Sequence, residues 1–174
     1  MYYSTKTYGT DRGLSCCFRQ WRADHSHCST LHGYSIGIKL IFKSETLDEK
    51  NWVMDFGGLK AFKAWADLMF DHTMLIAHDD PHLDTFMALD AIKGGFNDMG
   101  VVDLRVVDAV GCEAFAEMAY RQMDIILKSF QEGYIVNIDD QEYKARYPVN
   151  PGVKLVSAEV FEHAGNSAVY EGQQ

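Results

Sequence analysis

The chain has 174 residues, of which 47% are hydrophobic and 24% are charged, as in one ordinary globular domain. Its 16 basic and 25 acidic residues give a formal net charge of −9, which argues against a protein that binds nucleic acid through a basic surface. No run approaches the ~18 consecutive apolar residues of a transmembrane helix, and residues 1–6 do not begin a secretory signal. We therefore expect neither a nucleic-acid partner nor a membrane partner.

The cysteines bear on the cellular compartment. They are Cys16, Cys17, Cys28 and Cys112, and no two of them form a C-x-x-C pair. Reduced thiols in a cytoplasmic protein are the simplest interpretation of this pattern.

The N-terminal third of the chain predicts strands. Residues 14–22 contain no helix breaker, and residues 34–43 alternate between apolar and other side chains. The apolar face of this second strand carries Ile36, Ile38, Leu40 and Phe42. A polar turn over 44–51 then leads to a third, short strand over 52–54.

The middle of the chain predicts helices. Asp55 is a suitable N-cap for a helix over 56–70, whose apolar residues recur at every third or fourth position. A shorter helix is expected over 81–93, followed by a short strand over 101–107. The most regular apolar stripe lies over 113–130 and predicts the main helix of the chain.

The C-terminal part predicts a loop and a last strand. Residues 131–152 hold two of the three prolines and are expected to be mostly loop, whereas residues 153–161 alternate again. Strands at both ends of the chain with helices between them indicate an α+β fold with an antiparallel sheet. The edges of so small a sheet are a liability that pairing between copies removes. We therefore expect a homo-oligomer whose sheets join edge to edge.

A histidine- and cysteine-rich segment precedes the second strand. It places His25, His27, Cys28 and His32 within eight residues. Imidazole and thiolate are preferred ligands of zinc, so the segment is a candidate metal site. The alternative is a polar turn whose histidines face solvent.

Two further acidic and histidine-containing segments follow the first helix. Asp71 and His72 are adjacent, and such an aspartate can hold the imidazole in one tautomer and raise its basicity. The alternative is a helix C-terminus, where histidine favours the negative end of the dipole. Residues 77–82 predict either a weak second metal site or a surface turn capped by Asp79 or Asp80.

Two glutamates are also candidates for a binding site. Glu159 in the last strand is expected on the same face as Val153, Leu155 and Phe161. A carboxylate on an apolar face needs a partner, which is either a ligand edge with two N–H donors or an arginine. Glu113 opens the main helix, where acidic residues are common because of the helix dipole alone.

Five segments in order, spread from about residue 14 to 172, resemble the 6-pyruvoyl-tetrahydropterin synthase / 6-carboxytetrahydropterin synthase family. They are Cys28-x-x-x-His32-Gly33, V-M-D-F-G-G-L-K over 53–60, F-D-H-T-M-L over 70–75, G-C-E-A-F-A over 111–116, and Ala158-Glu159 with Gly165 and Tyr170. The resemblance implies the tunnelling fold (T-fold), in which an antiparallel sheet carries two main helices on one side. It also implies an oligomeric barrel, as a trimer or hexamer, and one domain over 1–174 with an insertion at about 77–110.

The resemblance further implies an activity and roles for individual residues. Such enzymes act on a small-molecule pterin, 7,8-dihydroneopterin triphosphate, and the bacterial branch makes 6-carboxytetrahydropterin on the route to 7-deazaguanine bases such as queuosine. Carried over to this chain, Cys28 is the general base and Asp71 with His72 forms a proton relay. Glu159 accepts two hydrogen bonds from the pterin ring, and Glu113 supports that pocket.

The chain departs from the family at the zinc site, which is built there from three histidines. His32 matches one of them, but Arg22 and Tyr34 stand where the other two are expected. Zinc is then held by His25, His27 and His32, or Tyr34 is a ligand, or Arg22 replaces the metal as a fixed cation that binds substrate. These changes leave two alternatives to the synthase: an enzyme acting on another pterin or purine-like substrate, and a non-catalytic pterin-binding scaffold.

Overall fold

The long strand β3 (His32–Ser44) organises the sheet of the computed structural model, which describes residues 1–95 and 100–172. Its first part pairs with β2 (Leu14–Phe18) and its second part with β1 (Tyr2–Tyr8), while β8 (Lys154–His163) pairs along its other edge. β9 (Asn166–Glu171) continues the sheet beyond β8. All of these pairs are antiparallel.

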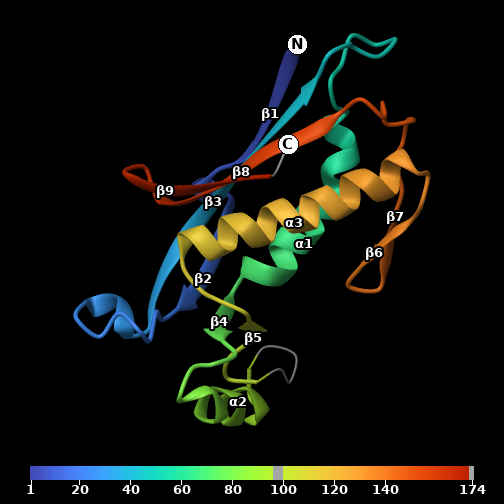
Figure 1. Cartoon of the computed structure of the whole chain (residues 1–174). Helices are drawn as coiled ribbons and strands as arrows, with labels where there is room; N and C mark the ends of the chain where they lie inside the picture. Colours follow the sequence, from blue (N-terminus) through green and yellow to red (C-terminus); the bar gives the residue numbers. More distant parts are fainter. Residues whose placement is uncertain (96–99, 173–174) are drawn as a thin grey trace.

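Two parallel strands extend the sheet on the other side of β2. β4 (Thr73–Ala77) pairs with β2, and β5 (Leu104–Val107) pairs with β4. Helix α2 (Leu83–Ala91) connects them, and Figure 1 shows it at the end of the molecule beyond these strands. The segment expected as an insertion at about 77–110 thus contains an α-helix and an added strand, and a small core around Ile76 and Phe86 lies beside them.

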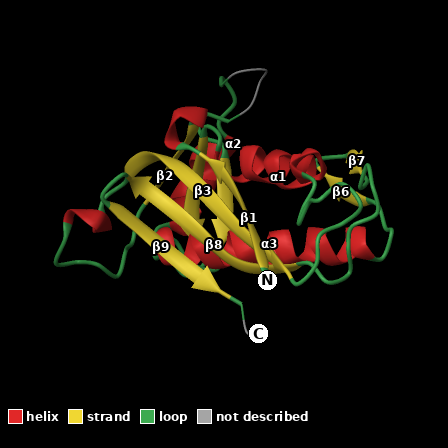
Figure 2. Ribbon diagram, turned by 90° about the horizontal axis from the view of Figure 1, so that it is seen from above, coloured by secondary structure: helices red, strands yellow, loops and turns green. Residues whose placement is uncertain are grey.

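Helices α1 (Lys60–Phe70) and α3 (Cys112–Gln131) lie side by side on one face of the sheet (Figures 1 and 2). The alternation predicted for β3 is confirmed, because its four apolar side chains are completely buried beneath these helices. Burying a large aliphatic or aromatic side chain contributes about 1.5–3 kcal/mol, so this face supplies much of the stability. In the described part of the chain, no helix is long and apolar enough to cross a membrane.

The start of the first helix confirms one prediction and corrects another. The Asp55 carboxylate accepts a hydrogen bond from the backbone N–H of Gly57 (2.8 Å), as expected of an N-cap. The first turn, Phe56–Leu59, is a 3₁₀ helix, and it contains two glycines, which are poor α-helix formers. The strand expected over 52–54 is wrong: this segment is irregular, although Val53 and Met54 are buried.

The segment expected to be a loop over 131–152 contains a small hairpin. Its strands are β6 (Val136–Ile138) and β7 (Gln141–Tyr143), which pair antiparallel. Asp139 and Asp140 between them have φ angles of 49° and 59°. Two consecutive residues of positive φ form the turn that matches the twist of two-residue hairpins, and aspartate tolerates it.

A bulge in β8 decides which side chains of that strand face the helices. Ile41 of β3 pairs with Ser157, but the next residue, Phe42, pairs with Leu155, so Val156 is an extra residue. A bulge shifts the alternation of every residue beyond it. Leu155 is therefore buried on the helix side, whereas Glu159 points to the opposite face. The expectation that Glu159 shares a face with Leu155 is wrong for this reason.

Candidate active site

The loop that carries Cys28 begins where β2 ends and returns to the start of β3. Phe18 and His32 are directly paired across the two strands. Between them a 3₁₀ turn, His27–Ser29, is capped by the Ser26 side chain, which accepts from the Cys28 N–H (3.2 Å). The half-buried Cys28 is thus placed at the end of the β2–β3 ladder.

Aromatic rings line the helix-side surface beside this loop. The His32 ring lies 4.9 Å from the Phe18 ring and 5.6 Å from the Tyr34 ring, measured between centroids. His32 Nδ1 lies 2.8 Å from the Thr30 carbonyl oxygen, which fixes the ring orientation. Desolvation raises the pKa of the Tyr34 hydroxyl, and the nearby Glu162, Cys28 and Cys112 raise it further, which places these groups around Tyr34.

The N-terminus of α3 meets the end of β8 at the same place. The Cys112 thiol donates to the Val160 carbonyl oxygen (3.6 Å). Burial raises the pKa of this thiol to about 12, with further contributions from Glu162 and Glu113. Two carboxylates therefore flank Cys112 at the positive end of the α3 dipole.

Four parts of the chain thus converge on one cluster, which we call the Cys28 cluster. It consists of Cys28, His32, Tyr34, Cys112, Glu113 and Glu162. Gly111 is required beside it, because its φ is 114° and an added Cβ would lie 2.6 Å from the Gln20 amide nitrogen. Two carboxylates beside a thiol can accept hydrogen bonds from a ring with adjacent N–H donors and take a proton from a bound molecule.

Glu162 is the residue of this cluster that the sequence did not single out. It lies at a second irregularity of β8, where the pairing with β9 shifts between Phe161 and His163. Glu159 belongs to a different environment. Its carboxylate accepts from Lys39 Nζ (3.2 Å) and from the Ser167 hydroxyl (2.8 Å), on the face without helices. The signal for Glu162 in the sequence is its spacing of two from the apolar Val160, because residues two apart in a strand lie on one face.

Asp71 and His72 form the expected pair, but away from Cys28. His72 Nδ1 lies 2.6 Å from Asp71 Oδ1, and the His72 backbone has a positive φ of 59°. The His72 N–H donates to the Ser15 carbonyl oxygen near the start of β2 (2.8 Å). Gln20, whose N–H donates to the Cys28 carbonyl (2.8 Å), follows the other end of β2, so the pair and Cys28 lie toward opposite ends of this strand. One chain therefore does not bring them together.

The residues expected to hold zinc do not converge either. The His25 side chain is 83% exposed, and His27 is also exposed. Arg22 is paired with Asp79 (2.5 Å). Within residues 1–95 and 100–172, no group of three or more His, Cys, Asp or Glu side chains is arranged to hold a metal ion. The residues present in one chain do not fit a zinc site.

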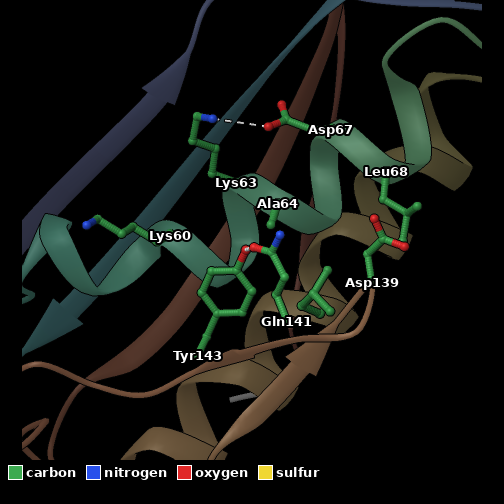
Figure 3. A pocket seen from close by; sticks show the side chains of 9 residues that line it. Lys60, Lys63, Ala64, Asp67, Leu68, Asp139, Gln141 and Tyr143 are labelled. Carbon is green, nitrogen blue, oxygen red and sulfur yellow. Dashed lines mark hydrogen bonds and ion pairs between the residues drawn. The ribbon is translucent and has the colours of Figure 1, made fainter.

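A separate hollow of about 530 Å³ lies between α1 and the β6–β7 hairpin. Figure 3 shows Lys63 paired with Asp67 on α1, with Gln141 and Tyr143 opposite. Its two lysines are balanced by Asp67 and Asp139, and none of the predicted site residues lines it. The hollow is thus not part of the Cys28 cluster.

Comparison with known proteins agrees with this architecture. Residues 10–173 match the family model described as 6-pyruvoyl tetrahydropterin synthase. An uncharacterized protein of Wolinella succinogenes, WS1659, superposes with a TM-score of 0.71 at 18% identity, covering 99% of this chain and 98% of that one. No curated protein matches the chain.

Two solved synthase structures share the fold. A catalytic residue mutant of Plasmodium vivax 6-pyruvoyltetrahydropterin synthase has a TM-score of 0.60 at 12% identity, with both chains fully covered. The Caenorhabditis elegans 6-pyruvoyl tetrahydropterin synthase has a TM-score of 0.54 at 14% identity, covering 99% of this chain and 94% of that one. The expected α+β tunnelling fold, with an antiparallel-rich sheet, is confirmed.

Proposed function

Since the chain belongs to the 6-pyruvoyl tetrahydropterin synthase family, we propose that it is a pterin-processing lyase of the 6-carboxytetrahydropterin synthase type. Its substrates are 7,8-dihydroneopterin triphosphate and water, and its products are 6-carboxytetrahydropterin, triphosphate and acetaldehyde. The reaction lies on the route to 7-deazaguanine bases such as queuosine. The observation that carries the proposal is the Cys28 cluster, in which Glu113 and Glu162 lie beside the Cys112 thiol, and Tyr34 lies near Cys28, Cys112 and Glu162.

The ring is anchored by Glu162 rather than by Glu159. A pterin presents two adjacent N–H donors on its 2-amino-4-oxo pyrimidine edge, and one carboxylate accepts both. Glu159 already accepts from Lys39 and Ser167 on the far face of the sheet. Glu162 lies beside Cys112, as does Glu113, and both Glu162 and Cys28 are near Tyr34.

Cys28 acts as the general base on the substrate side chain, and Asp71 with His72 relays protons from a second copy of the chain. The long separation within one chain supports this division. The sheet also leaves β1 and β9 unpaired along one edge each in the described part of the chain, and such edges favour pairing with another copy. The site is then completed between subunits of a homo-oligomeric trimer or hexamer.

No step of this reaction is assigned to zinc, because the residues in one chain do not fit the metal. Arg22 and Tyr34 stand where the family's histidines are expected, and this departure favours a second candidate function. In that case the same cluster serves an enzyme acting on another pterin or purine-like substrate, or a scaffold that binds a pterin without turnover.

The experiment is to incubate the purified oligomer with 7,8-dihydroneopterin triphosphate, with added zinc or with chelator, and to identify products by mass spectrometry. Formation of 6-carboxytetrahydropterin supports the synthase, and Cys28→Ala is expected to abolish it while pterin binding remains. Pterin binding without any product supports the second candidate. A fully active Cys28→Ala protein overturns the role of Cys28.

A mixing experiment tests whether the site is shared between chains. Cys28→Ala and His72→Ala are each expected to be inactive alone. When the two are co-expressed, about a quarter of the activity returns, because random mixing leaves both residues intact in one site out of four. Mixed oligomers that remain inactive contradict a shared site.

A further inference from the structure

The loop that carries Cys28 lacks an apolar anchor. From Arg19 to Leu31 no residue is buried, and the next completely buried side chain is Ile36 in β3. A surface segment without buried apolar contacts opens easily unless polar contacts hold it. The position of Cys28 therefore depends on hydrogen bonds and ion pairs.

A buried ion pair holds the first residue of this loop. Arg19 Nε lies 3.2 Å from Asp80 Oδ2, and the Asp80 side chain is completely buried. The other Asp80 oxygen accepts from the His82 N–H (2.8 Å), which fixes the carboxylate. The surface turn predicted over 77–82 is present and Asp80 caps it, but the Asp80 side chain is itself buried and has Arg19 as its counter-ion. In the described part of the chain, neither Arg19 Nε nor Asp80 Oδ2 has a hydrogen-bond partner, so the buried Asp80 charge depends on the nearby guanidinium.

The neighbouring Asp79 binds two further residues of the loop, Trp21 and Arg22. Its Oδ1 accepts from Trp21 Nε1 (3.1 Å), and its Oδ2 accepts from Arg22 Nη2 (2.5 Å). The Arg22 guanidinium also stacks on the Trp21 ring at 4.4 Å. One carboxylate therefore binds two adjacent side chains, and the charge of Arg22 is already compensated.

We propose that Asp79 and Asp80 form a clasp that positions the Cys28 loop, with Arg19, Trp21 and Arg22 as its other half. The link to Cys28 is Gln20, which lies between the clasped residues. Its N–H donates to the Cys28 carbonyl oxygen (2.8 Å), and its side chain lies against Gly111 at the start of α3. Asp79 and Asp80 are positioning residues, because they act on Cys28 through Gln20.

The clasp also gives Arg22 a role other than that of a cation replacing the metal. Arg22, Trp21 and Asp79 line a hollow of about 410 Å³ together with Asp108. Two carboxylates there offset the single guanidinium, so the hollow does not favour an anion such as the substrate triphosphate. Arg22 is therefore better placed to hold the loop through Asp79 than to bind an anion.

The test that is independent of pterin chemistry measures the loop itself. Asp79→Asn and Asp80→Asn are compared with Asp24→Asn, whose side chain lies in the same loop but is 95% exposed. Peptide-resolved hydrogen exchange over 19–31 and the rate of Cys28 alkylation by iodoacetamide are both expected to rise, about tenfold in Asp80→Asn and about threefold in Asp79→Asn, whose pair with Arg22 is partly exposed. Both are expected to stay unchanged in the control. If Asp80→Asn does not fold, the measurements on Asp79→Asn alone test the clasp, because this variant keeps the buried pair of Arg19 and Asp80. Unchanged exchange and alkylation overturn the proposal.

A kinetic test rests on the proposed function. The clasp variants are expected to lower kcat about 10- to 100-fold, since small displacements of a reacting group have effects of this size. KM is expected to change less than about threefold, because the ring anchor lies on β8 and α3. Faster exchange with unchanged kcat overturns the positioning role. A wild-type protein without turnover refutes the proposed function, while the loop measurements still decide on the clasp.

Discussion

Two carboxylates three residues apart on β8 have different environments. Glu159 lies on the face without helices, where Lys39 and Ser167 satisfy it. Glu162 lies beside Cys112 and Tyr34, where four parts of the chain meet. A bulge of one residue, at Val156, is therefore enough to place Glu159 on the face of the sheet opposite to Leu155.

The largest expected effect tests whether the two faces of β3 differ. Phe42→Ala, on the helix side, is expected to lower the free energy of unfolding by about 3–5 kcal/mol, because the completely buried ring leaves a cavity. Ile41→Ala, on the other face, is expected to lower it by about 1 kcal/mol. Urea denaturation at one protein concentration measures both. Equal losses contradict a core confined to the helix side.

The next largest effect is on pterin affinity, and it compares Glu162 with Glu159. Glu162→Gln is expected to weaken pterin binding about 100-fold, because a neutral amide cannot accept both ring N–H donors as a carboxylate does. Glu159→Gln, which has the same size and charge change, is expected to weaken it less than about threefold. Fluorescence titration with a pterin measures both affinities. If Glu159→Gln weakens pterin binding more than Glu162→Gln does, Glu159 and not Glu162 binds the ring.

Two buried thiols are expected to make the stability of the protein depend on pH. Burial raises the pKa values of Cys16 and Cys112 from 9.0 to about 12. The folded state thus keeps protons that the unfolded chain loses above about pH 9, so this contribution to stability is complete below pH 9 and decreases as the pH rises toward 12.

We therefore expect the urea midpoint of the reduced protein to fall between pH 8 and pH 10. In Cys16→Val the fall is expected to be smaller, because the more buried thiol is removed. A midpoint that does not depend on pH in this range contradicts the assignment.

The smallest effect concerns the pair on the open face. Lys39 and Glu159 are 34% and 18% exposed in their side chains. Partly exposed ion pairs contribute about 0.5–1 kcal/mol. A double-mutant cycle of Lys39→Met and Glu159→Gln in urea denaturation is expected to give a coupling energy of this size. A coupling above about 2 kcal/mol indicates that another chain covers the pair.

Much of the architecture could be predicted because local patterns produce it. The alternation at Ile36 to Phe42, the Asp55 cap and the main helix all depend on residues within a few positions of each other. The strands β1, β4 and β9 were not predicted. β4 is buried throughout, so its apolar run shows no alternation, and β1 and β9 are mostly exposed edge strands.

The sequence by itself determined the kind of molecule: its family segments and its α+β order are readable along the chain, and the roles proposed for Cys28, Asp71 and His72 follow from those segments. Only the tertiary structure decided which of these groups meet. Cross-strand register put Glu162 rather than Glu159 beside Cys112, strand length separated Asp71 and His72 from Cys28, and ion pairs over nearly sixty residues of sequence tied Arg22 to Asp79. These outcomes depend on pairing between distant segments, and periodicity within one segment carries no information about such pairing.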